Sequence, residues 1–327
     1  MTSQKPVAVI LLQLGGPDSL ESVEPFLYNL FCDPDIIDLP LAFLFRKPLA
    51  RFVASRRSPR VREYYKEIGG RSPILKLTRR QAVALEDRLR GTIDARVFVA
   101  MRYWHPLTEE AVDQIERGDF RRLVLLPLYP HYSKTTTGSS INEWNRVVRG
   151  RLPEDLEVDV VLDYSDHPEY IRSLVRNISI ALNRVPREER GRVVLVFSAH
   201  GTPVKLVHAG DPYQESILRT YRAVLAAGDF NLPHRLCYQS KVGPERWLEP
   251  SLDGTIRELA AEGVSHVITV PIAFVSDHSE TLWEINIETK RMARELGITH
   301  FDMSPALNTN ASFVEALADL VLERVAR

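Results

Sequence analysis

Cysteine is scarce in this chain, and its scarcity excludes two kinds of structure. The 327 residues include two cysteines, Cys32 and Cys237, which lie far apart and lack the close spacing of metal-binding pairs. The sequence therefore predicts neither a disulfide framework nor a cysteine-ligated metal cluster. A reducing cytosol is the compartment that fits best.

An excess of charge of either sign is also absent. Lysine and arginine together number 42 and aspartate and glutamate 43, so the formal net charge is -1. A nearly neutral chain gives no reason to expect nucleic acid or another polyanion as a partner, and any basic patch must be local.

Long apolar runs are missing near the N-terminus. The apolar run there covers residues 7–14, which is too short to span a bilayer and ends in Gly15, Gly16 and Pro17 without a small-residue cleavage pattern. We therefore expect this run to be the first buried strand of a cytoplasmic protein.

The common nucleotide and hydrolase motifs do not occur. No Gly-x-Gly-x-x-Gly or Gly-x-x-x-x-Gly-Lys-Ser/Thr sequence follows an expected strand, which argues against a nucleotide as ligand. No Gly-x-Ser-x-Gly sequence is present either. Gly15 and Gly16 before Pro17 indicate a ligand site only weakly, since a tight turn uses the same residues.

Short β-rich runs alternate with helical patterns along the whole chain. Expected strands cover residues 7–14, 96–103, 122–129, 157–163, 193–199, 235–239, 266–274 and 299–302. Expected helices cover residues 19–31, 78–90, 107–117, 140–149, 168–183, 212–226, 251–261, 278–296 and 311–325. This alternation predicts parallel sheets.

Chain length and the number of strands predict the domain organisation. A chain of 327 residues with 44% hydrophobic content suggests about two domains with ordinary cores. The predicted fold class is α/β, with two Rossmann-like, doubly wound domains that face each other across a cleft. Each would hold a mainly four-stranded parallel sheet, the first within residues 1–165 and the second within 166–305.

Three glutamates recur at a spacing of four after the expected strand 266–274: Glu280, Glu284 and Glu288. In an α-helix this spacing puts the carboxylates on one stripe, and Ser276 or Asp277 could cap the N-terminus. A solvated helix surface explains the stripe as well as a functional site does. If it lines a cleft, repulsion and burial would raise the pKa of at least one carboxyl.

His200 follows the expected strand 193–199, at the edge where open α/β sheets place ligands. A lone histidine is more often a hydrogen-bonding core residue than a ligand. Because the segment that opens with Asp277 and His278 also follows a strand, His200 and a carboxylate could instead form a proton acceptor or a divalent-metal site.

Three further segments each allow two interpretations. Residues 102–106 could be a turn with an aromatic plug or part of a site, and residues 129–140 could bind an anion or cap the next helix. The apolar run 39–45, followed by basic residues up to Arg57, could be a packed helix with a solvated basic face. It could also form a lip that touches an apolar ligand or a membrane.

Seven segments, in this order, resemble the ferrochelatase family. They are residues 12–17 (LQLGGP), 68–73 (IGGRSP), 101–103 (MRY), 129–140 (YPHYSKTTTGSS), 198–201 (SAHG), 238–244 (YQSKVGP) and 276–282 (SDHSETL). The resemblance implies an enzyme that inserts Fe2+ into protoporphyrin IX to make haem, on two Rossmann-like domains without a nucleotide. It also implies that a C-terminal helix at about 306–327 packs back on the first domain.

The same resemblance implies site residues. His200 and Glu280 match the family's metal-site pair, Glu284 and Glu288 match an acidic ladder leading away from it, and Asp277 and His278 belong to the same catalytic motif. Residues implied to line or hold the porphyrin are Leu14, Arg57, Tyr65, Ser72, Arg102, Tyr103 and Trp247.

The chain also departs from the family pattern. Leu14 stands where some relatives have Met, and Trp283 stands where Tyr is common. The C-terminal cysteines that hold an iron–sulfur cluster in some members are missing, so no cluster and no permanently bound cofactor are expected. Fe2+ is expected as a substrate only.

Two other functions remain open. A cobalt or nickel tetrapyrrole chelatase would share the two-domain plan and the His/Glu pair. A non-catalytic porphyrin or haem carrier would need an apolar pocket but no carboxylate ladder. For the enzyme, weak peripheral contact of residues 39–53 with the inner face of the cell membrane is expected, because its substrate is hydrophobic.

Overall fold

The computed structural model describes residues 6–36, 42–153, 155–241 and 245–326, with the backbone alone for 42–44. The chain divides into two compact units. One is formed by Met1–Leu162 together with Val314–Arg327, and the other by Asp163–Phe313. The sequence placed this division a few residues later, between residues 165 and 166.

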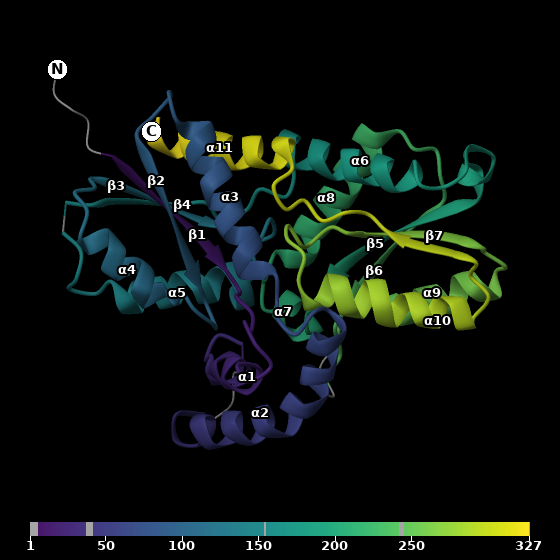
Figure 1. Cartoon of the computed structure of the whole chain (residues 1–327), viewed down its shortest axis with the longest axis horizontal. Coiled ribbons are helices and arrows are strands. Elements are labelled where there is room, and N and C mark those ends of the chain that lie inside the picture. The colour runs from purple at the N-terminus through teal and green to yellow at the C-terminus, as the bar shows by residue number, and fades with distance from the viewer. Residues whose placement is uncertain (1–5, 37–41, 154, 242–244, 327) are drawn as a thin grey trace. The chain divides into compact units, whose positions relative to one another are not determined.

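The first unit is built on a four-stranded parallel sheet with the strand order β2-β1-β3-β4 (Figure 1). Its strands are β1 (Val7–Gln13), β2 (Ala95–Met101), β3 (Arg122–Pro127) and β4 (Glu157–Val160). Val7 of β1 pairs with Ala95 on one side and Arg122 on the other. Every residue of β1 is buried, which explains why this run is apolar throughout and does not alternate.

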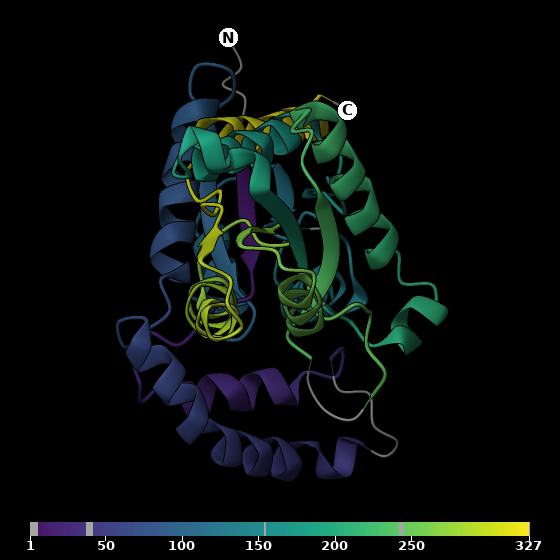
Figure 2. The ribbon, with the colours of Figure 1, turned by 90° about the vertical axis from the view of Figure 1, so that its right-hand side faces the viewer.

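The helices of the first unit are α1 (Val23–Cys32), α2 (Ala42–Glu67), α3 (Ile74–Leu89), α4 (Thr108–Glu116), the short π-helix η1 (Lys134–Gly138) and α5 (Ser139–Val147). Helix α3 packs against β1 and β2. The side chains of Ala8 and Ile10 share a core cluster with Val112 of α4 and Trp144 of α5. Helices α1 and α2 lie side by side in two views (Figures 1 and 2).

The second unit repeats the plan, with the strand order β6-β5-β7-β8. Its strands are β5 (Val193–His200), β6 (His234–Gln239), β7 (His266–Pro271) and β8 (His300–Met303). Its helices are α6 (Pro168–Leu182), the 3-10 helix η2 (Arg187–Arg192), α7 (Val204–His208), α8 (Tyr213–Gly228), α9 (Leu252–Ala261), the π-helix η3 (Glu280–Thr289) and α10 (Lys290–Glu295). Val196 of β5 packs in one core cluster with Ile256 of α9 and Ile285 of η3.

The last helix, α11 (Ala311–Val325), has its later residues in the first unit. Glu315 pairs with Arg88 of α3, and the guanidinium of Arg122 in β3 donates a hydrogen bond of 2.6 Å to the Val325 carbonyl. These contacts tie the C-terminal helix to the sheet that begins the chain.

All eight expected strands form, and the predicted fold class of two four-stranded parallel sheets is confirmed. The expected ends at 163 and 274 are wrong, because β4 ends at Val160 and β7 at Pro271. The apolar run with basic residues lies partly outside the described residues, at 39–41. From Ala42 onward it belongs to the long helix α2.

The expected α-helix over 278–296 is wrong in type and start. A π-helix begins at Glu280 and passes into α10 at Lys290. Neither Ser276 nor Asp277 caps it, because Asp277 is held by Asn308: its N–H donates to Asn308 Oδ1 at 3.1 Å and its carboxylate accepts from Asn308 Nδ2 at 2.9 Å. Among the described residues, no helix is both long and apolar enough to cross a membrane.

Candidate active site

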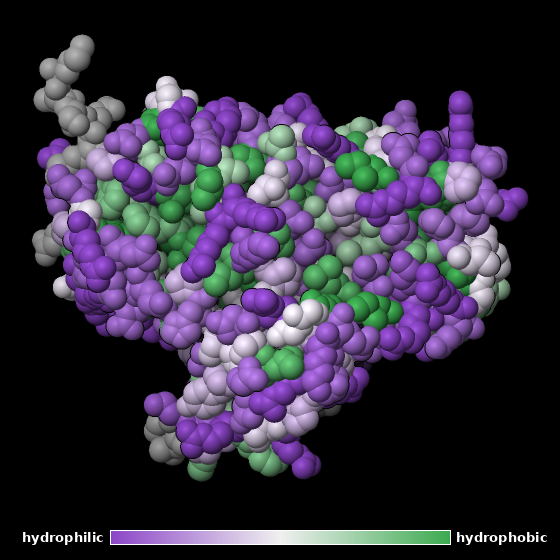
Figure 3. Space-filling model, viewed as in Figure 1, coloured by the Kyte–Doolittle hydropathy of each residue, from purple (hydrophilic) through white to green (hydrophobic). Residues whose placement is uncertain are grey.

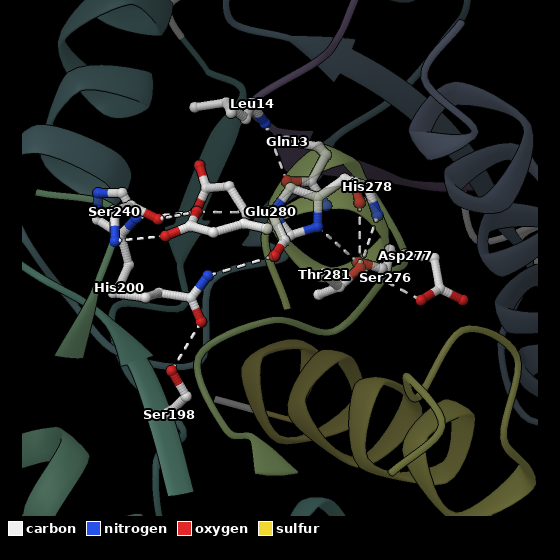
Figure 4. Close-up of polar contacts among 12 residues, drawn as sticks. Gln13, Leu14, Ser198, His200, Ser240, Ser276, Asp277, His278, Glu280 and Thr281 are labelled. Carbon is white, nitrogen blue, oxygen red and sulfur yellow. Dashed lines mark hydrogen bonds and ion pairs between the residues drawn. The ribbon is translucent and has the colours of Figure 1, made fainter. Parts of the chain in front are cut away.

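The site of the second unit is centred on a histidine and a carboxylate. His200 is the last residue of β5 and Glu280 the first residue of η3, and Nδ1 of the imidazole lies 2.8 Å from Oε2 of the carboxylate (Figure 4). Their side chains keep 36% and 26% of their surface exposed, so both can be reached from solvent. The structure thus brings together the two residues implied as the metal pair.

The backbone around His200 is held by close packing. The Tyr213 hydroxyl donates a hydrogen bond of 2.9 Å to the His200 carbonyl. A Cβ atom at Gly201 would lie 2.9 Å from the Gln239 carbonyl oxygen and 3.2 Å from the Trp247 ring, so a side chain there would push β5 and β6 apart. The glycine after His200 is therefore needed for the strand end to pass this close to its neighbours.

Two aromatic rings flank the imidazole of His200. The centroids of Trp247 and Phe274 each lie 6.4 Å from the His200 ring, at steep angles to it, and Phe274 also contacts His278 at 4.7 Å. Such walls lower the local dielectric and strengthen the ion pair between His200 and Glu280.

Glu284 lies one helical turn beyond Glu280, and both carboxylates approach Ser240. Its carboxylate accepts hydrogen bonds from the Ser240 N–H at 2.7 Å and the Ser240 hydroxyl at 2.6 Å, and the same hydroxyl is 3.3 Å from Glu280 Oε2. Glu288 is exposed. The three glutamates therefore run from a partly buried pair to the protein surface.

His200, Glu280 and Glu284 shift each other's pKa values. Burial alone would lower the pKa of His200, but the charge and the hydrogen bond of Glu280 raise it above its ordinary value. Burial alone would raise the pKa of Glu280, but the charge and the hydrogen bond of His200 hold it well below its usual range. For Glu284, burial and the neighbouring charge of Glu280 raise the pKa to about 7. The sequence-based expectation of one raised carboxyl pKa is met at Glu284.

Asp277 and His278 hold the start of η3. The His278 ring binds the Ser276 carbonyl through Nδ1 at 3.0 Å, and its Nε2 lies 3.9 Å from Glu280 Oε2. Asp277 also accepts a hydrogen bond from Thr281 at 3.3 Å, in addition to its bonds with Asn308. Asp277 therefore fixes the loop, while His278 keeps its second ring nitrogen beside the His200–Glu280 pair.

The porphyrin-binding residues implied by the sequence, apart from Trp247, lie in the first unit. Leu14, Tyr65 and Tyr103 belong to one hydrophobic cluster between β1, α1 and α2. Ser72 is buried against Gly16, whose missing side chain leaves the space that Ser72 occupies. Arg57 is exposed, with its guanidinium 5.6 Å from the Phe31 ring centroid.

Arg102 is held by polar contacts with Asp33 and Ser139. Its guanidinium lies 3.1 Å from the carboxylate of Asp33 and donates to Ser139 Oγ at 2.8 Å. The Tyr103 hydroxyl also donates to Asp33, at 2.5 Å. Asp33 is buried, and it was not identified from the sequence because one aspartate after a helix carries no local signal.

Ser198, Gln239 and Ser240 were also missed as site residues. Ser198 donates to Gln239 Oε1 at 2.7 Å, and the Gln239 amide donates to the Glu280 carbonyl at 3.3 Å. The available signal was their position, because all three stand at the carboxyl ends of β5 and β6, where polar residues gather around ligands.

The donor set bears on which metal chemistry is possible. In the described ranges, no group of three or more histidine, cysteine, aspartate or glutamate side chains is arranged to hold a metal ion. An imidazole and a carboxylate supply two ligands. A metal ion bound there would complete its coordination with water or with a substrate, which suits a transient cargo better than a resident ion.

Known proteins resemble this chain over nearly its whole length. Residues 6–325 match the sequence model of the ferrochelatase family. A ferrochelatase of Geotalea uraniireducens (strain Rf4) is 48% identical over 97% of this chain and 98% of its own length. A ferrochelatase of Aquifex aeolicus (strain VF5) is 44% identical over 97% and 99%.

Solved structures resemble the fold at low sequence identity. SirB from Bacillus subtilis with Fe3+ has a TM-score of 0.55 at 11% identity, covering 98% of this chain and 96% of its own. CbiX, the terminal enzyme for biosynthesis of siroheme in denitrifying bacteria, has a TM-score of 0.51 at 12% identity, covering 98% and 99%. These two structures support the fold, while the match over nearly all of the sequence decides the family. The chain belongs to the ferrochelatase family.

Proposed function

We propose that this chain is a metal chelatase that inserts Fe2+ into protoporphyrin IX and so forms haem. The observation that carries the proposal is the His200–Glu280 pair, which places an imidazole and a carboxylate 2.8 Å apart at the carboxyl end of a parallel sheet. Family membership points to the same reaction.

Metal insertion makes three demands on such a site. The two N–H protons of the porphyrin must be removed, the ring must bend to expose its nitrogen lone pairs, and the metal must lose water. The His200–Glu280 pair offers a base and a metal ligand side by side. Glu284, with its pKa near 7, can take up a proton near neutral pH. Apolar walls that fit a bent ring better than a flat one would supply the distortion.

A site with so few nitrogen and oxygen ligands discriminates poorly between divalent metals. Binding should follow the general order of divalent metals, in which Fe2+ does not bind more tightly than Co2+ or Zn2+. We therefore expect insertion of Zn2+ and Co2+ in vitro.

Steady-state absorbance tests the proposal. Protoporphyrin IX, Fe2+ and the protein are mixed under reducing conditions, with coproporphyrin and a more carboxylated tetrapyrrole in parallel. Haem formed over many turnovers, fastest with protoporphyrin IX, is the expected result. Porphyrin binding without turnover would indicate a carrier, and preference for the more carboxylated ring would indicate a different chelatase.

An iron–sulfur cluster forms no part of this proposal. The chain has two cysteines, and of these Cys237 is buried within strand β6, where burial raises the pKa of its thiol to about 12. A protonated, buried thiol is a poor cluster ligand. Purified protein should show iron only in proportion to bound haem.

We infer further that α2 makes weak peripheral contact with anionic membranes. Phe45, Leu49 and Phe52 are 64%, 39% and 62% exposed, and their spacing of four and three places them on one face of the helix. Arg46, Lys47, Arg51 and Arg56 stand between and beside them. Each cation near an anionic surface contributes about 1 kcal/mol.

The surface around this helix favours weak over strong binding. In the space-filling view, the region of α2 is mostly hydrophilic with isolated hydrophobic side chains (Figure 3). Single aromatic residues combined with cations suit reversible association with a bilayer surface. Such contact would bring the enzyme close to a substrate that partitions into lipid.

A further inference from the structure

Ser240 has an unusual backbone conformation for a residue with a side chain. It follows the last residue of β6 and has φ of +66°, in the left-handed region that favours glycine. Non-glycine residues held in this region cluster at functional sites, because the surrounding structure must compensate for the strain.

The strained turn directs two donors of one residue at one carboxylate. The N–H of Ser240 meets Oε1 of Glu284 at 2.7 Å, and its hydroxyl meets Oε2 of the same group at 2.6 Å. Both oxygens of Glu284 are therefore fixed, and the side chain cannot rotate without losing both bonds.

The same hydroxyl also reaches Glu280, whose Oε2 is 3.3 Å away. That oxygen is the one that binds His200 Nδ1 at 2.8 Å. A hydroxyl has a single hydrogen, so Ser240 bridges the two glutamates without satisfying both at once. The Ser240 hydroxyl therefore lies between the His200–Glu280 pair and the carboxylate of Glu284.

A second hydrogen-bonded chain from the same strands supports this arrangement. Ser198 of β5 binds Gln239 of β6, and the Gln239 amide binds the Glu280 carbonyl at 3.3 Å. Gln239 thus holds the backbone of the first η3 residue, while Ser240 holds the side chains of the first two glutamates. In Figure 4, His200 and Ser240 lie beside Glu280.

We propose that Ser240 is a positioning residue for metal insertion: its hydroxyl holds the carboxylates of Glu280 and Glu284 in register with His200, and the strained turn serves to place that hydroxyl. The proposal rests on the function proposed above. At this φ, glycine would give a more stable turn than serine. Stability alone therefore does not explain a serine at this position.

Three variants separate the hydroxyl from the backbone strain. Ser240→Gly removes the hydroxyl, relieves the strain and keeps the N–H bond to Glu284. Ser240→Ala removes the hydroxyl and keeps the strain. Ser240→Thr keeps the hydroxyl and adds the strain of a β-branched side chain in the left-handed region. Asp229→Gly is the matched control, because Asp229 has φ of +44°, is exposed and ends α8 away from the site.

We expect kcat to depend on whether the variant keeps the hydroxyl, and Tm to depend on how strained its backbone is. Ser240→Gly and Ser240→Ala should lose about tenfold in kcat, as residues that orient metal ligands do, with the dissociation constant for porphyrin unchanged. Ser240→Thr should keep more activity than Ser240→Gly although its Tm is lower. Asp229→Gly should keep the wild-type kcat.

Zn2+ affinity of the porphyrin-free protein, measured by calorimetry, gives a second readout that needs no turnover. Ser240→Gly should weaken it about tenfold. Wild-type kcat and Zn2+ affinity in Ser240→Gly, or activity that simply follows Tm across the three variants, would overturn the assignment. A folded wild-type protein that binds porphyrin but never turns over would instead overturn the proposed function, and the Zn2+ series would still decide the role of Ser240.

Discussion

The carboxylates of Glu280 and Glu284 lie against one hydroxyl group, but their pKa values are shifted in opposite directions. Ser240 Oγ is 3.3 Å from Glu280 Oε2 and 2.6 Å from Glu284 Oε2. His200 keeps Glu280 ionised, whereas burial and the charge of Glu280 raise the pKa of Glu284 to about 7. Glu280 therefore stays ionised across neutral pH, whereas Glu284 gains and loses a proton there, which is the arrangement that separates a metal ligand from a proton acceptor.

The three glutamates of η3 should contribute unequally to catalysis. Glu280→Gln should lower kcat by about 10²- to 10⁴-fold, because it removes the charge that His200 and the metal require. Glu284→Gln should lower kcat by about tenfold and shift its pH dependence. Glu288→Gln should change kcat by less than about threefold, since Glu288 is exposed. Steady-state kcat from pH 6 to 9 measures this order, and equal small effects at all three positions would make the stripe an ordinary helix surface.

His200→Ala should abolish turnover without unfolding the protein. The variant lacks the imidazole and leaves Glu280 without its partner. We therefore expect kcat to fall by about 10²- to 10⁴-fold. Porphyrin binding, followed by fluorescence quenching, should persist. Near wild-type turnover in a folded His200→Ala protein would return this residue to a structural role.

The raised pKa of Glu284 should appear in the pH dependence of stability. Its pKa is 4.5 when unfolded and about 7 in the folded protein, so the folded state holds the extra proton between these values. The stabilisation from this group is complete below pH 4.5 and is lost as the pH rises to 7. Urea unfolding of wild type and Glu284→Gln should therefore diverge, with the variant gaining relative stability from pH 5 to pH 8. A constant difference across that range would contradict the pKa shift.

Asp33 should matter for the stability of the first unit. Burial alone would raise its pKa, but hydrogen bonds from Ser139 and Tyr103 and the charge of Arg102 lower it. Removing one partner from a buried ion pair costs about 3–5 kcal/mol, so Asp33→Ala should lower the free energy of unfolding by that amount. Tyr103→Phe removes one hydroxyl and should cost about 1–2 kcal/mol. Chemical unfolding measures both, and a smaller effect of Asp33→Ala than of Tyr103→Phe would show that Asp33 is not the centre of this network.

Membrane association should depend on the exposed face of α2. Phe45→Ser combined with Phe52→Ser should reduce co-sedimentation with anionic liposomes and leave turnover with detergent-solubilised porphyrin unchanged. Val83→Ser is the control, because Val83 is 63% exposed but lies on α3. Binding that is absent from the start, or equal in all three proteins, would exclude a membrane role for this helix.

The sequence by itself determined the strands, the class of fold and the family. β1 is apolar because both faces of its sheet are covered, and such runs are visible without any knowledge of their neighbours. Short motifs at strand ends, such as the one containing His200, were equally visible, because their order along the chain carries the resemblance.

Tertiary structure alone decided how the site residues are held. The segment after β7 forms a π-helix instead of an α-helix, and Ser240 adopts a left-handed turn whose N–H binds Glu284 of that helix. Arg102, by contrast, is bound to a buried aspartate far away in the sequence. Helical and strand periodicities are local and can be seen in the sequence, whereas the pKa of Glu284 and the partner of Arg102 arise from burial and charges that only the folded chain brings together.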